Sequence, residues 1–378
     1  MPGHAETVRF DRNEVSGAFG DLGTSLPLIV GMIAAAKLDA TSVLVVFGAL
    51  QILTGLLYRL PMPVQPLKAV AALVIAQQAS AEVLYGGGLA IGLLMLVLVL
   101  TGLLDWLSRV VPLVVVRGIQ CGLGLQLGRI AVADYIPSGG AVGYGLAGLS
   151  FLVVVTLLGN RRWPPAPIVL AIGAAFAVTV GGAGAFAAAG LHLPAPHIPS
   201  GSAIWQGFLL LALPQIPLSL GNSVLATKQV AADLFPGRVP LTIRRIGFTY
   251  SIMNIAGPFL SGIPVCHGSG GMAGHYAFGG RTGGSVIIAG AALALTGLVF
   301  GGSVGAVALL FPKPMLGVLL LVEGVAMLSL LRDLAGSPRE FSLALCLGVI
   351  AAALPYGYLV ALVLGTVLAR TTWRVTTT

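Results

Sequence analysis

Apolar residues along this chain form long, nearly continuous runs that are separated by short polar or glycine-rich breaks. About fourteen runs can be counted, at roughly 16–36, 42–60, 64–79, 88–107, 110–132, 142–158, 166–190, 204–227, 244–262, 265–279, 284–301, 303–331, 341–355 and 357–370. A helix of about 20 apolar residues spans the ~30 Å hydrocarbon core of a membrane. The pattern therefore predicts an all-α polytopic membrane protein with about 14 transmembrane segments.

Two of these runs, 64–79 and 265–279, are too short to cross the membrane as one helix. Each begins with a Pro-Val pair followed by a polar residue, Pro63-Val64-Gln65 in one and Pro264-Val265-Cys266 in the other. Broken helices at corresponding places in two halves of a chain are typical of a transporter's binding site. We therefore expect half-helices at segments 3 and 10, with the functional site between them.

The two junctions are one sign of an internal duplication. Further matches fall near the same offset of about 200 residues: Gly55 with Gly257, Pro112 with Pro312, and Gly118 with Gly317. Seven spans per half would start the second half on the opposite side of the membrane, so the pattern predicts an inverted repeat. The expected units are a first repeat at 1–190, a connecting loop at 191–203 and a second repeat at 204–378.

Composition excludes a water-soluble globular protein, because 57% of the residues are hydrophobic and only 8% are charged. The net charge of +8 comes from basic residues scattered through short loops, which indicates a topology signal and no nucleic-acid partner. With the N-terminus inside, fifteen of the 20 lysines and arginines lie on the cytoplasmic side. We expect an integral protein of the cell (inner) membrane with both termini in the cytoplasm.

Two carboxylates, Asp21 and Glu323, lie well inside apolar runs. Burying a charged carboxylate in a membrane is costly, so each needs a partner, water or a proton. Asp21 is expected to face a cavity. Glu323 is either a structural or gating residue or part of the site.

Polar residues form a stripe on each of two helices that would be equivalent in the repeat. The stripe on the first run consists of Asp21, Thr24 and Ser25, and the stripe on the eighth consists of Gln215, Ser219, Asn222 and Ser223. Such residues either line one cavity or only join helices by hydrogen bonds. We expect a cavity role for Asp21, Gln215 and Asn222.

The junctions themselves favour an anion site. Pro66 suits the first turn of a helix that starts after Gln65, and glycines from Gly268 onward allow close backbone approach. Two helix N-termini that face each other in mid-membrane present unpaired N–H groups and partial positive charge. We expect Lys68 to add a full positive charge to this site; alternatively it snorkels to the membrane surface or pairs with Asp21.

The sequence does not predict a metal centre at Cys266 and His267, because no further cluster of ligands lies at metal-binding spacing. His267 is better interpreted as a donor or titrating group near the second half-helix. We expect no metal and no cofactor. The chain also lacks a serine–histidine or two-carboxylate constellation, so we do not expect an enzyme.

Several motifs resemble the molybdate transporter branch of the sulfate permease superfamily. They are Phe19-Gly20-Asp21-Leu22-Gly23-Thr24, Pro61-Met62-Pro63-Val64-Gln65-Pro66-Leu67-Lys68-Ala69, the segment 213–223, and the segment 264–283. The similarity spans nearly the whole chain. As is usual for this branch, no C-terminal STAS domain is expected.

The resemblance implies a seven-plus-seven inverted repeat with two moving parts. A core of segments 1–4 and 8–11 would move against a gate of segments 5–7 and 12–14, with substrate between half-helices 3 and 10. Transferred site positions are Gln65, Lys68, Cys266 and His267, with Asp21, Gln215 and Asn222 lining the pocket. The superfamily also suggests a homodimer in the lipid bilayer.

The resulting hypothesis is a secondary active importer of a tetrahedral oxyanion, with molybdate first and sulfate second. Moving a dianion into a negative interior costs ~2.3 kcal/mol per charge per 100 mV, which proton symport would offset. Asp21, His267 and Glu323 are the candidate proton carriers. A passive anion channel of the same fold, or a carrier for an organic anion or nucleobase, remains an alternative.

Overall fold

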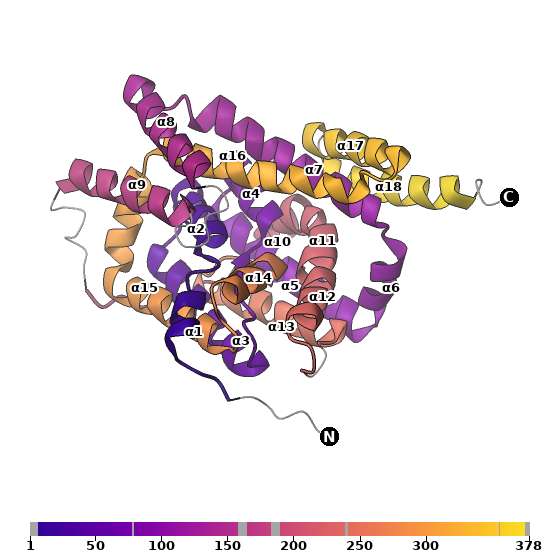
Figure 1. The fold of residues 1–378 in the computed structure, drawn as a ribbon, viewed down its shortest axis with the longest axis horizontal. Helices are drawn as coiled ribbons and strands as arrows, with labels where there is room; N and C mark the ends of the chain where they lie inside the picture. The colour runs from indigo at the N-terminus through magenta and orange to yellow at the C-terminus, as the bar shows by residue number, and fades with distance from the viewer. Residues whose placement is uncertain are drawn as a thin grey trace.

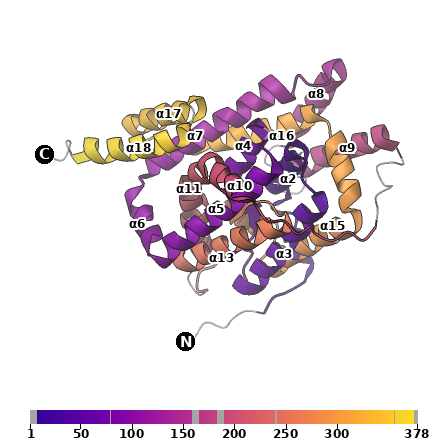
Figure 2. The same ribbon diagram turned by 180° about the vertical axis from the view of Figure 1, so that it is seen from behind.

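The structure, a computed structural model, describes residues 7–77, 79–157, 165–182, 190–238, 241–354 and 356–374 (Figures 1 and 2). The elements of the first half are α1 (Arg12–Gly17), α2 (Leu22–Ala36), α3 (Ala40–Tyr58), β1 (Val64–Pro66), α4 (Lys68–Gln77), α5 (Ala81–Leu100), α6 (Leu103–Val110), α7 (Leu113–Ile130), η1 (Ala131–Tyr135), α8 (Gly140–Thr156) and α9 (Pro165–Gly181). Apart from the three residues of β1, all of these are helices.

The second half follows a similar order. Its elements are α10 (Gly201–Gly207), η3 (Phe208–Ala212), α11 (Leu213–Leu218), η4 (Ser219–Leu225), α12 (Ala226–Leu234), α13 (Ile243–Ala256), η5 (Gly257–Leu260), β2 (Val265–His267), α14 (Ser269–Ala277), α15 (Gly284–Leu310), α16 (Lys313–Ser329), η6 (Leu330–Leu334), α17 (Pro338–Ala353) and α18 (Gly357–Arg374). The segments α10 to α12 form one continuous helix, Gly201–Leu234, with two π-helical stretches.

Six helices of the described chain are long and apolar enough to cross a membrane, and shorter apolar helices accompany them. The six are Ala40–Tyr58, Ala81–Leu100, Leu113–Tyr135, Gly201–Leu234, Gly284–Leu310 and Lys313–Leu334. The prediction of an all-α membrane protein is therefore confirmed. The two short predicted runs are also found as α4 and α14, which have 10 and 9 residues.

Some predicted boundaries are wrong, and the largest error lies between the predicted runs 284–301 and 303–331. Helix α15 continues to Leu310, and the chain breaks at Phe311 and Pro312. Gly301 lies inside this helix and does not end it. A Cβ at this position would collide with Thr41 of α3, so the glycine lets α15 pack closely on its neighbour, as small residues do between membrane helices.

Two further boundaries differ near the N-terminus. The sequence predicts one helix over 16–36, but α1 ends at Gly17 and α2 begins at Leu22. The run expected over 88–107 begins earlier, because the Ser80 hydroxyl caps α5 by accepting a hydrogen bond from the Val83 amide.

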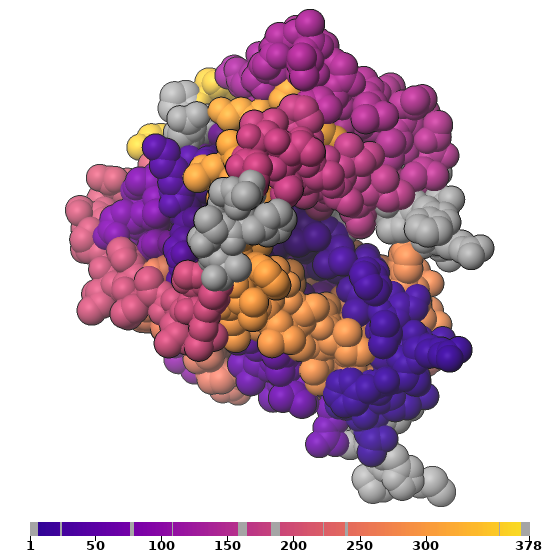
Figure 3. Space-filling view, turned by 90° about the vertical axis from the view of Figure 1, so that its left-hand side faces the viewer, coloured from indigo at the N-terminus to yellow at the C-terminus, as the bar shows by residue number. Residues whose placement is uncertain are grey.

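The helices form two groups in space. In Figures 1 and 2, α7, α16, α17 and α18 run side by side along the upper edge, and α8 packs on α16 at one end. In the lower group α3 packs on α15, α5 packs on α13 and α10, α12 packs on α14, and α4 packs on α2 and α11. Figure 3 shows the magenta residues around α8 above the indigo N-terminal and orange residues of the lower group. Helix α9 contacts both groups.

The two strands lie side by side and pair antiparallel, although they come from opposite halves of the chain. Val64 pairs with His267, Gln65 with Cys266, and Pro66 with Val265. All of these residues are buried. Because a helix follows each strand at once, the pairing brings the N-termini of α4 and α14 to the same place in the fold.

Candidate functional site

Each strand is held by one side-chain amide from the helix before it. Gln51 of α3 donates to the Val64 carbonyl over 3.1 Å and accepts from the Val64 amide over 2.8 Å. Asn254 of α13 donates to the Val265 carbonyl over 2.6 Å and accepts from the Val265 amide over 2.8 Å. These two amides therefore satisfy the strand backbone in the same way in both halves. The sequence pattern did not single out either residue, although their offset of 203 positions is close to that of the junctions.

Behind the first strand, Asp21 and Gln65 form a buried pair. The Gln65 amide group donates to one carboxylate oxygen of Asp21, and the Ser25 hydroxyl donates to the other over 2.8 Å. A Cβ on Gly268 would lie 1.7 Å from the Gln65 side-chain oxygen, and one on Gly271 would lie 2.8 Å from Asp21. Glycine is therefore needed at both positions for the two halves to approach this closely.

The N-terminus of α4 carries a side-chain cap that comes from the other half of the chain. The Gln215 side-chain oxygen accepts from the amides of Ala69 and Val70 over 3.1 and 3.3 Å. Its amino group donates to Ser219 over 3.2 Å, and Ser219 is hydrogen-bonded to the Tyr250 hydroxyl over 2.8 Å. The first-turn donors of α4 are thus occupied in part by a neutral amide.

The N-terminus of α14 is different. Its N-cap residue, Gly268, has no side chain that could cap the helix, and its carbonyl accepts the first helical bond from Met272 over 3.0 Å. A Cβ on Gly270 would meet nothing within 4 Å. This helix end therefore opens onto free space.

That space is a cavity of about 180 Å³ between the two half-helices, α16 and the helix that carries Gln215, which also contributes Leu218 and Ser223. Six of the predicted site residues line it: Gln65, Lys68, Gln215, Cys266, His267 and Gly268. On the facing helix the sequence had singled out only Glu323, and the lining residues Met327 of α16 and Leu330 of η6 were not predicted. One turn before Met327 lies Glu323, so α16 turns a partly polar face to the half-helices.

Lys68 is paired with Glu323 and not with Asp21, the partner considered from the sequence. Its ammonium donates to the Glu323 carboxylate over 2.5 Å, and both side chains are largely buried, with 24% and 14% exposed. This ion pair joins α4 of the lower group of helices to α16 of the upper group. One charged residue from each group thus meets beside the cavity.

Among the described side chains, Asp21, Pro66 and Ser219 are not in the lining of the cavity. Ser219 lies behind it as the partner of Gln215. Pro66, predicted in the first turn of the half-helix, lies instead in β1 opposite Val265, because strand pairing continues to this residue and α4 begins only at Lys68. Backbone positions of Thr24 and Asn222 fall in α2 and η4, but their side chains lie outside the described residues.

His267 borders the cavity, but its ring is held by other residues. The ring nitrogen Nε2 is hydrogen-bonded to the Thr249 hydroxyl over 2.7 Å, and the ring packs edge-on against Tyr58 at 5.4 Å. The residue is fully buried. In the described part of the chain, no group of three or more His, Cys, Asp or Glu side chains could hold a metal ion.

A third buried carboxylate, Glu14, was missed because it precedes the first apolar run. It is 1% exposed and accepts from the amides of Arg281, Thr282 and Ser285 over 3.0, 2.8 and 2.9 Å. It therefore fixes the loop between α14 and the start of α15.

Comparison with known proteins assigns the chain to a family. The family model described as "Molybdate transporter of MFS superfamily" matches residues 13–127 and 207–327, which include both half-helix junctions. Molybdate transporter 2 of Arabidopsis thaliana is 33% identical over 387 residues, covering 89% of this chain and 82% of that protein. Molybdate transporter 1 of Chlamydomonas reinhardtii is 30% identical over 473 residues, covering 93% and 90%.

Solved structures identify the fold. The transmembrane domain of a cyanobacterial bicarbonate transporter, BicA, superposes with a TM-score of 0.68 at 17% identity, covering 92% of this chain and 98% of that one. The murine anion transporter Slc26a9 in its inward-facing state gives a TM-score of 0.73 at 16% identity, covering 97% and 69%. These identities establish a shared fold only. With the family model on both junctions and relatives at 30–33% identity along most of its length, this chain belongs to the molybdate transporter family, a family of transporters and not of enzymes.

Proposed function

We propose that this protein is a secondary active transporter that imports molybdate by alternating access. The observation that carries the proposal is the meeting of two half-helix N-termini at one small cavity, with α14 open and a lysine beside it. Molybdate as the substrate is supported by the names of the relatives. Sulfate, a dianion of the same shape, is the second candidate.

The oxygens of the anion accept hydrogen bonds, so we propose that hydrogen-bond donors of the protein hold it. We propose that the first amides of α14, at Ser269 and Gly270, bind it together with the Gln65 amide and Lys68. Backbone N–H groups and the helix dipole both favour an anion at an uncapped helix N-terminus. The capped end of α4 would contribute mainly its dipole and Lys68.

The moving parts would follow the two groups of helices. We propose an inverted repeat of 1–190 and 204–378, with a core of segments 1–4 and 8–11 and a gate of segments 5–7 and 12–14. The equivalent roles of Gln51 and Asn254 support the repeat. Since the cavity has both half-helices on one side and α16 on the other, sliding of core against gate would open it to each side of the membrane in turn.

Proton symport would offset the cost of moving a dianion against the membrane potential. Of the candidates Asp21, His267 and Glu323, we favour Glu323. Its ion pair occupies the ammonium of Lys68. Neutralising this carboxylate would release that ammonium for the anion.

Uptake into proteoliposomes tests the proposal. Purified protein should accumulate labelled molybdate above equilibrium when the outside is acidic, and uptake should saturate. Uptake that stops at equilibrium under every gradient would identify a passive channel. Stronger inhibition by unlabelled sulfate than by unlabelled molybdate would make sulfate the substrate. We further propose a homodimer in the cell (inner) membrane with both termini cytoplasmic.

A further inference from the structure

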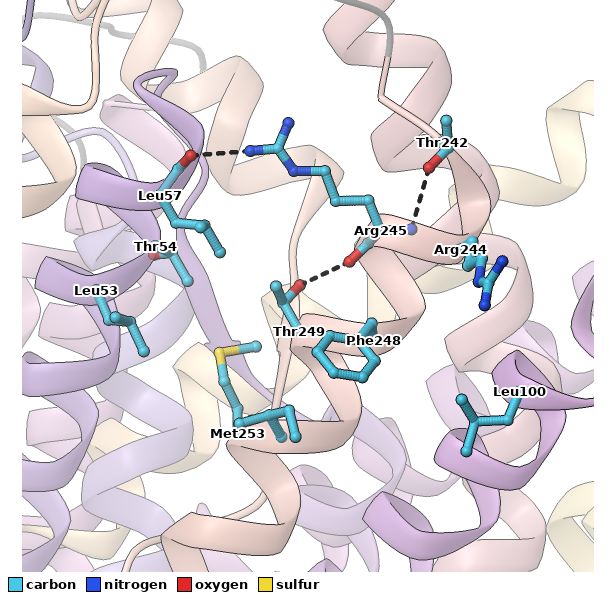
Figure 4. Close-up of a pocket in the computed structure, with 11 residues that line it drawn as sticks. Leu53, Thr54, Leu57, Leu100, Thr242, Arg244, Arg245, Phe248, Thr249 and Met253 are labelled. Carbon is cyan, nitrogen blue, oxygen red and sulfur yellow. Dashed lines mark hydrogen bonds between the residues drawn. The ribbon is translucent and has the colours of Figure 1, made fainter.

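A second, larger cavity lies away from the anion site. It is an open groove of about 520 Å³ between α3, α13 and the last turn of α5 (Figure 4). Pockets of roughly 300–1,000 Å³ are typical of small-ligand sites. Its walls are mainly apolar side chains that are 42–61% exposed: Leu53, Leu57, Leu100, Phe248 and Ile252.

One end of this groove is basic. Arg244 and Arg245 both line it, and none of its eleven lining residues is acidic. Figure 4 shows the Arg245 guanidinium reaching across to α3, where it donates to the Leu57 carbonyl over 2.9 Å. It also lies 4.9 Å from the centre of the Tyr58 ring. Arg244 is exposed, and no hydrogen bond or ion pair to it is found among the described residues.

The basic end coincides with the ends of two helices, of which α3 is long and apolar enough to cross a membrane. Helix α3 finishes at Tyr58, and α13 begins at Ile243. The same side of the molecule carries the N-terminal segment, because Gly55 packs on Gly283 and the backbone of Arg9 packs on Gly284. In a membrane, this placement would set the apolar walls within the hydrocarbon and the two arginines near its surface.

We propose that this groove binds an anionic phospholipid, with one acyl chain against the apolar walls and the phosphate on Arg244 and Arg245. Guanidinium groups pair with phosphate through two parallel hydrogen bonds. Basic pockets between membrane helices at the membrane surface suit anionic headgroups. An apolar helix is a poorer occupant of this groove than a phospholipid, because it would bring no anion to the two arginines.

The groove also reaches the back of the transport site. Thr249, which lines the groove, is hydrogen-bonded both to His267 of β2 over 2.7 Å and to the Tyr58 hydroxyl over 2.6 Å. A bound lipid would therefore contact the side chain that orients His267.

Native mass spectrometry of the full chain, titrated with phosphatidylglycerol or phosphatidylcholine, tests the proposal. Wild type should bind phosphatidylglycerol more tightly. The double variant Arg244→Gln/Arg245→Gln should lose about tenfold in affinity, which is the effect of about 1.4 kcal/mol. The matched control is the pair Arg339→Gln/Arg370→Gln, which makes the same change in charge at exposed arginines elsewhere.

A second variant keeps the test valid if the charge variant fails to fold. Ile252→Trp fills the groove from an exposed position without changing charge, and it should lower phosphatidylglycerol binding by a similar factor. The proposal is overturned if both variants bind this lipid like wild type, or if phosphatidylcholine binds equally well. It is also overturned if glycerol 3-phosphate, which has no acyl chain, displaces the lipid completely at equal concentration.

Discussion

At the scale of single residues, two buried amides perform the same task in the two halves. Gln51 and Asn254 each give one hydrogen bond to a strand residue and accept one from it. Neither residue touches the cavity. Their role is to fix the register in which β1 and β2 meet, and with it the position of both half-helices.

Replacing either amide by leucine should therefore destabilise the fold. Gln51→Leu leaves the Val64 amide and carbonyl without these partners, and each buried unsatisfied group costs about 1–3 kcal/mol. Thermal melting of the detergent-purified protein should show a clear loss in Tm, and Asn254→Leu should behave alike. The exposed Gln229→Leu is the control, and an equal loss there would refute the assignment.

Gly268 allows a test of Gln65 without altering Gln65 itself. The Cβ of Gly268→Ala would overlap the Gln65 side-chain oxygen, so the amide must move away from Asp21 and the cavity. We expect molybdate affinity to fall roughly tenfold, since a hydrogen bond to a charged group contributes about 1.5–3 kcal/mol. Isothermal titration calorimetry measures the change.

The comparison for this variant is Gly148→Ala in α8, where an added Cβ meets nothing within 4 Å. It should bind molybdate like wild type. Unchanged affinity in Gly268→Ala would mean that Gln65 does not hold the anion.

At the scale of elements, the two half-helices are not equivalent. Gln215 caps α4, whereas the N-cap residue of α14 is Gly268, which has no side chain to cap the helix. The anion should therefore depend on the backbone N–H groups of α14 more than on those of α4. This asymmetry can be tested by removing a single N–H group.

Ser269→Pro removes the first N–H group of α14 while keeping the helix. Proline is well tolerated at the first helical position, and the residue before it, Gly268, already has the extended backbone that proline requires (φ −111°, ψ 115°). We expect roughly tenfold weaker molybdate binding in the same titration. Ser269→Ala keeps the N–H group and should bind normally. Equal affinities of the two variants would exclude this amide as a ligand.

At the scale of the whole molecule, the ion pair of Lys68 and Glu323 connects the two groups of helices beside the cavity. If the groups move against each other during transport, this contact must change in each cycle. Whether Lys68 is free to bind the anion would then depend on whether Glu323 is charged.

Glu323→Gln should therefore uncouple transport from the proton gradient. In proteoliposomes we expect molybdate exchange to persist while acidification of the outside no longer drives accumulation, because glutamine cannot carry the proton. The exposed Asp233→Asn makes the same change in charge and should remain coupled. Accumulation by Glu323→Gln at the wild-type level would assign the proton to Asp21 or His267 instead.

The sequence by itself determined the class of protein and the two broken helices. Long apolar runs favour a membrane, and the Pro-Val junctions interrupt the helices locally, whatever the tertiary arrangement. These local properties also pointed to Gln65, Lys68 and Gln215 as candidate residues. That Cys266 and His267 belong to the same site was implied by the family resemblance, and the structure brings all five residues to one cavity.

Only the tertiary structure decided which groups satisfy each other. Hydropathy records how strongly a residue avoids water, but the partner of a buried polar group depends on which helix lies opposite. For this reason the capping role of Gln215, the pairing of Lys68 with Glu323 and the burial of Glu14 had no signal in the pattern. The same reason explains the wrong end of α15, where glycines that looked like a break are a packing surface against α3.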